Sequence, residues 1–158
     1  MAIVGPVFFD TSILLAGLVE MGDASVPAAR ILDDVARGAV SSPVTAWHCC
    51  LEFYSVATRL PAGLRLEPEL ARRLVEEEVL GRFKVCDLPG DSRSRFFAEA
   101  ASARMTGGRI YDVHIAEIAR LAGARVVVTD NQRHFVTLAQ HAIQVWNGTE
   151  YLEASGLR

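Results

Sequence analysis

Three consecutive valines at positions 126–128 constrain the fold of this chain more than any other stretch. Valine is β-branched and favours strands, and a short run that is apolar at every position predicts a strand buried on both faces of a sheet. Residues 7–9 form a second run of this kind, and weaker strand candidates occur at residues 39–41, 83–88 and 143–146. Short apolar strands of this type are typical of a buried parallel sheet.

Longer segments with apolar residues at helical spacing separate the strand candidates. Residues 25–38 are an example, because Ala28, Ile31 and Val35 recur on one face of the predicted helix. A helix is also predicted to begin at residues 10–12, and the remaining predicted helices cover residues 43–60, 67–80, 92–105, 111–122 and 135–140. Strands alternating with helices predict a three-layer α/β/α fold with a central parallel sheet of about five strands.

The composition is that of an ordinary globular domain, with 51% apolar and 22% charged residues. A length of 158 residues predicts a single domain, which we expect to cover residues 1–158. The sequence has no apolar run near the roughly 18 residues of a membrane span and no secretory signal pattern, so we expect a soluble, cytoplasmic protein. The three cysteines, Cys49, Cys50 and Cys86, form no CxxC pair, which disfavours a disulfide framework or a zinc site.

The net charge of −3 excludes a protein that binds nucleic acid by bulk positive charge alone. A local basic surface remains open, because every basic residue except Lys84 is an arginine, which suits bidentate phosphate contacts. A solvated face is the simpler interpretation of each arginine. The candidates for such a surface are Arg72, Arg73, Arg93, Arg95, Arg104 and Arg109.

Acidic and amide side chains follow the two clearest strand candidates. Asp10 comes directly after residues 7–9, and Asp130 and Asn131 follow the valine strand and Thr129. In open α/β sheets, ligands collect at the carboxyl ends of the strands, so both positions are candidate ligand sites. The simpler interpretation of each is a helix cap or a turn, which Asp and Asn also favour.

Two further acidic residues lie on predicted helices. Asp112 shares a helix face with apolar residues such as Ile115 and Ala119, and a carboxylate on an apolar face is costly unless something compensates it. The alternative for Asp112 is a cap near the start of its helix. Glu52 lies in the middle of a predicted helix, where a solvated glutamate close to Arg59 is the simpler interpretation.

If these acidic residues converge, their mutual repulsion must be offset. Two carboxylates about 4.5 Å apart repel by roughly 3–4 kcal/mol at an effective dielectric constant of about 20. Protonation could relieve this repulsion, and a hard divalent cation with oxygen ligands relieves it better at neutral pH. An all-oxygen site suits Mg²⁺ or Mn²⁺, whereas zinc and copper favour His or Cys ligands.

Four motifs in order along the chain resemble those of PIN-domain ribonucleases. Residues 8–12 are similar to the first motif, and residues 51–53, with Arg59 seven residues after the glutamate, resemble the second. Residues 107–116 are similar to the third motif in the form found in VapC-like toxins of prokaryotic toxin–antitoxin pairs. Residues 127–135 look like the fourth. The resemblance covers nearly the whole chain, and four motifs in order are more specific than any one of them.

The resemblance implies a PIN-like fold, an acidic pocket that binds Mg²⁺ or Mn²⁺, and hydrolysis of RNA phosphodiester bonds. Asp10, Glu52 and Asp112 match the three core acidic positions of the family, and Asp10 and Asp112 are the expected metal ligands. Glu52 would hold a second cation or orient the nucleophile. Three hydroxyl side chains would contact a phosphate or order the carboxylates: Thr11, Ser12 and Thr129.

The fourth catalytic position departs from the simplest family pattern. The family's acidic residue lies two positions after the threonine, and this chain has Asn131 there, whereas Asp130 lies one position after it. Spacing favours Asn131 as the site residue. Because adjacent side chains at a strand end normally point in opposite directions, we expect only one of the two to face the pocket.

The resemblance also implies two protein partners, namely a second copy of the chain in a homodimer and a cognate antitoxin. The segment predicted as a helix over residues 43–60 carries Trp47, Cys50, Leu51 and Tyr54. That is more apolar surface than contact with one side of a sheet requires, and it fits a protein contact.

Other classes of protein fit less well. A haloacid-dehalogenase-like phosphatase would have a second aspartate two residues after the first, where this chain has Ser12. A receiver-like phosphoacceptor domain would have a lysine at the end of a late strand, but the only lysine, Lys84, begins a strand candidate. A PIN-like module that binds RNA or protein without cleavage remains open, and metal-dependent cleavage of RNA would separate it from a nuclease.

Overall fold

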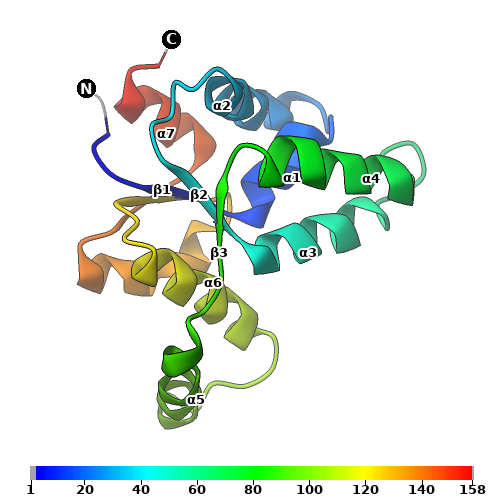
Figure 1. The fold of residues 1–158 in the computed structure, drawn as a ribbon. Helices are drawn as coiled ribbons and strands as arrows, with labels where there is room; N and C mark the ends of the chain where they lie inside the picture. Colours follow the sequence, from blue (N-terminus) through cyan, green and yellow to red (C-terminus); the bar gives the residue numbers. More distant parts are fainter. Residues whose placement is uncertain (1–2, 158) are drawn as a thin grey trace.

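The computed structural model describes residues 3–157, so the outermost ends of the expected domain lie outside the described part of the chain. Its centre is a five-stranded parallel sheet with the strand order β3-β2-β1-β4-β5 (Figure 1). The strands are β1 (Val7–Phe9), β2 (Pro43–Ala46), β3 (Lys84–Cys86), β4 (Val126–Val128) and β5 (Gln144–Trp146). The predicted α/β fold with a parallel sheet of five strands is confirmed.

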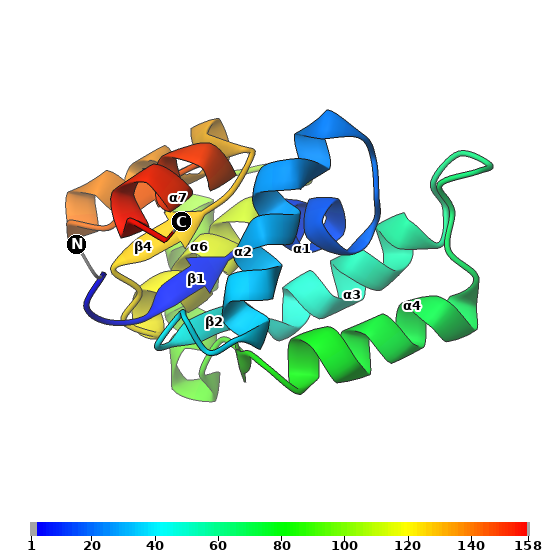
Figure 2. The same cartoon turned by 90° about the horizontal axis from the view of Figure 1, so that it is seen from above.

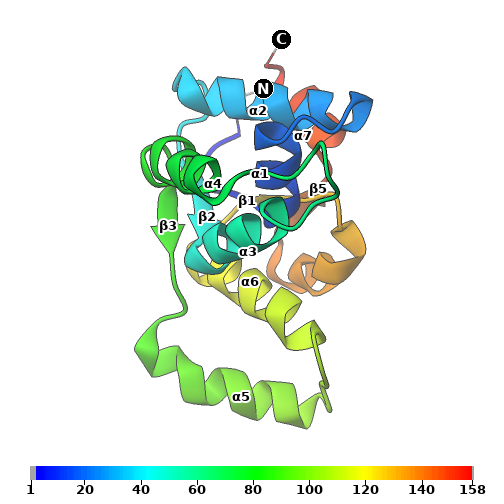
Figure 3. The same cartoon turned by 90° about the vertical axis from the view of Figure 1, so that its right-hand side faces the viewer.

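Helices cover both faces of the sheet. The α-helices are α1 (Thr11–Leu18), α2 (Val26–Ala36), α3 (Trp47–Ala57), α4 (Pro68–Leu74), α5 (Arg93–Ser102), α6 (Arg109–Leu121) and α7 (Gly148–Ser155). Shorter or irregular helical segments are η1 (Asp23–Ser25), η2 (Val75–Leu80), η3 (Gly90–Ser92) and η4 (Gln132–His141). Figure 3 shows α2 and α7 on one side of the sheet, α6 on the other, and α5 projecting beyond α6.

The central strands are buried throughout because every position in them is apolar. The three residues of β1 and the three of β4 are all buried, and β1 pairs with β2 on one side and β4 on the other. Phe9 packs edge to face against Phe83 and Tyr151, with ring centroids 5.8 and 5.6 Å apart. This rigid centre fixes the carboxyl ends of β1 and β4 side by side.

The second strand lies later in the chain than predicted. It forms at Pro43–Ala46 instead of residues 39–41, and the helix expected from residue 43 begins at Trp47. Pro43 can open a helix, but it is also tolerated as the first residue of a strand. Here it pairs with Val7, and the β-branched Val44 and Thr45 continue the strand.

Helix α3 has apolar residues both in the core and on the surface. Cys50 and Ala57 are buried, whereas Trp47, Leu51 and Tyr54 are 43%, 56% and 40% exposed. Figure 2 shows that α4 packs alongside α3. An apolar strip of α3 therefore remains on the surface.

Two other segments differ from the sequence predictions. The predicted helix over residues 67–80 is α4 followed by a wider π-helical turn, η2, and the predicted helix at 135–140 is a 3₁₀ helix within η4.

Helix α7 was not predicted from the sequence, and it begins with a capping box. The side chain of Asn147 accepts a hydrogen bond from the backbone N–H of Glu150, whose carboxylate accepts one from the N–H of Asn147.

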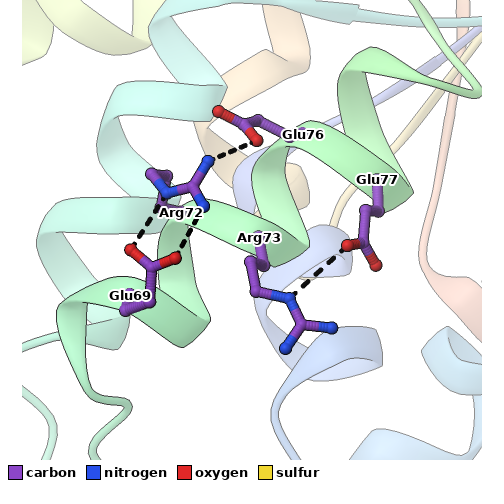
Figure 4. A network of polar contacts seen from close by, with 5 residues as sticks. All are labelled: Glu69, Arg72, Arg73, Glu76 and Glu77. Atoms are coloured by element: carbon purple, nitrogen blue, oxygen red, sulfur yellow. Dashed lines mark hydrogen bonds and ion pairs between the residues drawn. The ribbon is translucent and has the colours of Figure 1, made fainter.

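The arginines of α4 are occupied by neighbouring glutamates. Arg72 pairs with Glu69 at 2.6 Å and with Glu76 at 2.5 Å, and Arg73 lies 3.5 Å from Glu77 (Figure 4). Arg95 is similarly 3.6 Å from Glu99. Within residues 3–157, the candidate arginines without an ion pair are Arg93, Arg104 and Arg109.

In the same part of the chain, no helix has both the length and the apolar character needed to cross a bilayer.

Candidate active site

A small cavity of about 160 Å³ lies at the carboxyl ends of β1 and β4. Asp10 reaches it from the end of β1, Glu52 from α3, and Asp112 from α6. The full lining is Asp10, Thr11, Ser12, Leu15, Glu52, Val56, Asp112, Ile115, Asn131, His134 and Phe135. The structure therefore brings together the three acidic residues that the sequence singled out, although they come from distant parts of the chain.

Asp10 is the most buried of the three carboxylates, with 5% of the residue exposed. Its Oδ2 accepts hydrogen bonds from the hydroxyls of Thr129 at 2.7 Å and Ser12 at 3.2 Å. Burial raises the pKa of Asp10, and these hydrogen bonds oppose that rise because they stabilise the charged form. Asp10 stands at the N-cap position of α1, but its side chain makes no capping hydrogen bond.

Glu52 and Asp112 each have a partner of their own. The Thr11 hydroxyl donates to Oε2 of Glu52 at 2.7 Å, and within the described residues Glu52 makes no ion pair with Arg59. The Nδ1 atom of His134 lies 3.3 Å from Oδ2 of Asp112. Asp112 is the fourth residue of α6, whose N-cap is Gly108, so it does not cap the helix. The three carboxylates thus have different polar neighbours.

His134 also lines this cavity, although it was not among the predicted site residues. The four histidines of the chain are scattered, and none has the spacing typical of a zinc site. The placement of His134 depends on η4, which follows β4 in the chain and packs against α6 and β5. The sequence feature that could have identified His134 is its position three residues after Asn131, at the start of a helical segment.

The two candidates for the fourth position lie in different cavities. Asn131 lines the acidic cavity, whereas Asp130 lines a separate, larger one. Hydroxyl groups fix both backbones, since the N–H of Asn131 donates to Thr129 Oγ1 at 3.0 Å and the N–H of Asp130 donates to Ser12 Oγ at 3.0 Å. Burial also raises the pKa of Asp130.

The donor set of the acidic cavity fits a hard divalent cation in kind. Three carboxylates and one amide supply oxygen ligands, which Mg²⁺ and Mn²⁺ prefer. Across residues 3–157, no three His, Cys, Asp or Glu side chains are grouped closely enough to enclose a metal. Mg²⁺ needs no such enclosure, because it commonly keeps several waters and binds through one or two carboxylates.

The cysteines near this site are unsuited to nucleophilic chemistry. Burial raises the pKa of Cys49 to about 12 and that of Cys50 to about 11. Both thiols therefore stay protonated at neutral pH, and a thiol is a poor nucleophile compared with a thiolate. The chemistry of the cavity rests on oxygen ligands and on His134.

Comparison with known proteins agrees with this arrangement. Residues 7–140 match the family model described as the PIN domain. Ribonuclease VapC27 from Mycobacterium tuberculosis (strain ATCC 25618 / H37Rv) is 30% identical over 125 residues, which span 79% of this chain and 85% of that protein. Ribonuclease VapC40 from the same organism is 29% identical over 121 residues, which span 77% of this chain and 84% of that protein.

Solved structures share the fold at lower identity. The crystal structure of VapBC2 from Rickettsia felis, bound to a DNA fragment from their promoter, matches with a TM-score of 0.60 and 14% identity. The match covers 90% of this chain and 98% of that one. Together, the family match, the sequence relatives and the fold show that this chain belongs to the PIN-domain family and is a VapC-like member of it.

Proposed function

We propose that this protein is a metal-dependent ribonuclease that hydrolyses RNA phosphodiester bonds, using Mg²⁺ or Mn²⁺. The observation that carries the proposal is the convergence of Asp10, Glu52 and Asp112 on one cavity, each with a polar neighbour of its own. Membership of the PIN-domain family and the names of the ribonuclease relatives support it.

Asp10 and Asp112 would hold the cation. When bound there, the cation would polarise the scissile phosphate and lower the pKa of a coordinated water. The hydroxyls of Thr129 and Ser12 favour the ionised form of the Asp10 carboxylate and orient it through their hydrogen bonds. The Nδ1 atom of His134, 3.3 Å from Oδ2 of Asp112, would help to orient that carboxylate for a ligand.

Glu52 has a different environment and a different role. Glu52 is exposed, and its carboxylate oxygen Oε2 accepts a hydrogen bond from the Thr11 hydroxyl. It would orient the attacking water or hold a second cation. Asn131 would contribute a neutral oxygen ligand, directly or through a water. The hydroxyls of Thr11, Ser12 and Thr129 order the carboxylates, which favours that role over direct contact with phosphate.

The same proposal includes the biological role of a toxin in a toxin–antitoxin pair, acting in the cytoplasm as a homodimer with a cognate antitoxin. The VapC-like sequence relatives and the VapBC2 structural neighbour support this role. The exposed strip of α3, formed by Trp47, Leu51 and Tyr54, offers an apolar surface for a protein contact.

The test is cleavage of a panel of single-stranded RNAs by the purified protein with Mn²⁺, compared with the same reactions in EDTA. We expect cleavage that requires the metal and is abolished by Asp112→Asn. Asp33→Asn is the matched control, because it removes the same charge from an exposed position on α2 outside the cavity. RNA binding without cleavage under every metal condition would instead favour the non-catalytic binding module.

A further inference from the structure

A second cavity of about 610 Å³ adjoins the acidic one at the end of β4. It lies between α2 and α7, which pack side by side (Figure 3). Its lining is Ile13, Asp23, Ala24, Pro27, Ala28, Asp130, Gln132, Asn147, Gly148 and Thr149. Ser12, which lines the acidic cavity, links residues of the two linings, because its hydroxyl accepts from the N–H of Asp130 and donates to the carboxylate of Asp10.

The two cavities differ in what they can hold. At about 160 Å³, the acidic cavity has room for a cation with its waters but not for a nucleotide. The second cavity falls within the range of about 300–1,000 Å³ that is typical of pockets for small organic ligands. An RNA chain whose phosphate is at Asp10 would have a neighbouring base within reach of this larger cavity.

The walls of the larger cavity suit a flat, polar-edged ring. The apolar lining residues are Ile13, Ala24, Pro27 and Ala28, of which Ala24 and Pro27 are accessible at the surface. The polar lining residues include Asp130. A base in this cavity would place a face against Ala24 and Pro27 and turn its edge toward the polar groups.

Among the polar lining groups, Asp23, Asp130 and the Gln132 oxygen can accept hydrogen bonds from a ligand. The Asn147 oxygen already accepts from the N–H of Glu150, so its amide nitrogen can donate, and the Thr149 hydroxyl can do either. Asp23 and Asp130 are carboxylates, which only accept when ionised. The amide nitrogen of Gln132 is already committed, since it donates to Val145 O at 3.2 Å and to Glu150 at 2.8 Å, so its oxygen is the atom left for a ligand. Within residues 3–157, the Asp130 carboxylate has no side-chain hydrogen bond or ion pair, although it is partly desolvated.

We propose that this cavity binds a guanine base of the RNA substrate, with the Asp130 carboxylate accepting from its N1–H and 2-amino groups. Guanine alone among the four RNA bases presents two neighbouring donors on its Watson–Crick edge. Adenine and cytosine each present one amino donor next to a ring-nitrogen acceptor, and uracil presents one N–H between two carbonyls. Those acceptors would face a carboxylate and be repelled. The proposal rests on the proposed ribonuclease function, because it makes Asp130 a specificity-determining residue for that reaction.

Binding is measured in EDTA, where no hydrolysis occurs, by fluorescence anisotropy with short labelled oligoadenosine RNAs that contain one guanosine, one inosine or neither. Inosine lacks the 2-amino group, so we expect the inosine RNA to bind about tenfold more weakly than the guanosine RNA. Asp130→Asn should remove this preference, and the matched Asp33→Asn variant should keep it. Melting curves check that each variant is folded.

Several results would overturn the proposal. Equal affinity of the wild-type protein for the three RNAs would do so even if Asp130→Asn failed to fold, and so would a lack of measurable binding. A free guanosine monophosphate that binds as tightly as the RNA would place the pocket's ligand outside the RNA. A melting shift with Mg²⁺ that disappears in Asp130→Asn would identify Asp130 as a cation ligand instead.

The two proposals fail in distinguishable ways. Metal-dependent cleavage with no guanosine preference would leave the ribonuclease function standing and remove the guanine pocket. A guanosine preference that Asp130→Asn abolishes, without cleavage of any RNA in Mn²⁺, would leave the pocket standing and remove the hydrolytic function.

Discussion

Replacing Thr129 with valine tests whether the buried carboxylate of Asp10 is ionised and held by its hydroxyl partner. Thr129 is fully buried, and valine has nearly the same shape, so the substitution removes a hydroxyl without leaving a large void. The lost hydroxyl donates to Asp10 at 2.7 Å and accepts from the backbone N–H of Asn131 at 3.0 Å.

The magnitude follows from the charge of the acceptor. A hydrogen bond to a charged group contributes about 1.5–3 kcal/mol to stability, compared with about 1 kcal/mol for a neutral one. Thr45→Val is the matched control, because Thr45 is equally buried and its hydroxyl donates to the neutral carbonyl oxygen of Phe9 at 2.8 Å. We expect Thr129→Val to lower the free energy of unfolding by about 1–2 kcal/mol more than Thr45→Val at neutral pH.

The pH dependence gives this prediction a sign. Burial raises the pKa of Asp10, and the Thr129 hydroxyl lowers it again, so the hydrogen bond stabilises the ionised form. Its contribution is complete well above the pKa of Asp10 and is lost as the pH falls through it. Urea unfolding of the wild type and both variants, in EDTA across a range of pH, measures the effect. Equal losses for the two variants at every pH would refute the reasoning.

Outcomes are expected for four further variants. Asp10→Asn should raise the melting temperature of the metal-free protein at neutral pH, because the raised pKa of Asp10 makes its buried charge costly above that pKa. This gain should shrink as the pH falls. The same variant should lose the Mn²⁺-induced rise in melting temperature, and a wild type without such a rise would count against the metal site. Asn131→Asp should tighten Mn²⁺ binding by about tenfold in calorimetry, since it adds a carboxylate beside the cation. Leu51→Glu should convert a dimer into a monomer in light scattering while changing the free energy of unfolding by only about 0.5 kcal/mol, because Leu51 is exposed. Arg72→Ala should leave the melting temperature within experimental error, since its ion pairs are solvent-exposed.

The parts of the fold that could be predicted from sequence are those with one dominant local signal. The valines of β4 and the apolar run of β1 have no competing interpretation, and both strands form where predicted. Pro43 has two permitted roles, the start of a helix or the start of a strand, and only pairing with β1 selects the second. The α7 helix had a readable signal in Asn147 and Glu150, whose spacing is that of a capping box.

The candidate site divides in the same way. Asp10 and Asp112 could be singled out because a carboxylate at a strand end or on an apolar helix face is costly without a role. Glu52 was identified only through the resemblance of its motif, and the structure places all three in one cavity. His134 could not, since its contact with Asp112 depends on the path of η4. Which of Asp130 and Asn131 faces the acidic cavity depends on the turn after β4, which no single residue determines.

The hydrogen bond between Asp10 and Thr129 joins residues 119 positions apart. During synthesis at about 5–20 residues per second, roughly 6–24 s pass between the emergence of these two residues. During this interval the central strand β1 lacks β4, its pairing partner on one side. A nascent chain therefore carries the first acidic residue long before it carries the group that orients it, and no truncated product that ends before β4 can assemble the cavity. The proposed ribonuclease would thus be inert during translation until residue 129 has left the ribosome.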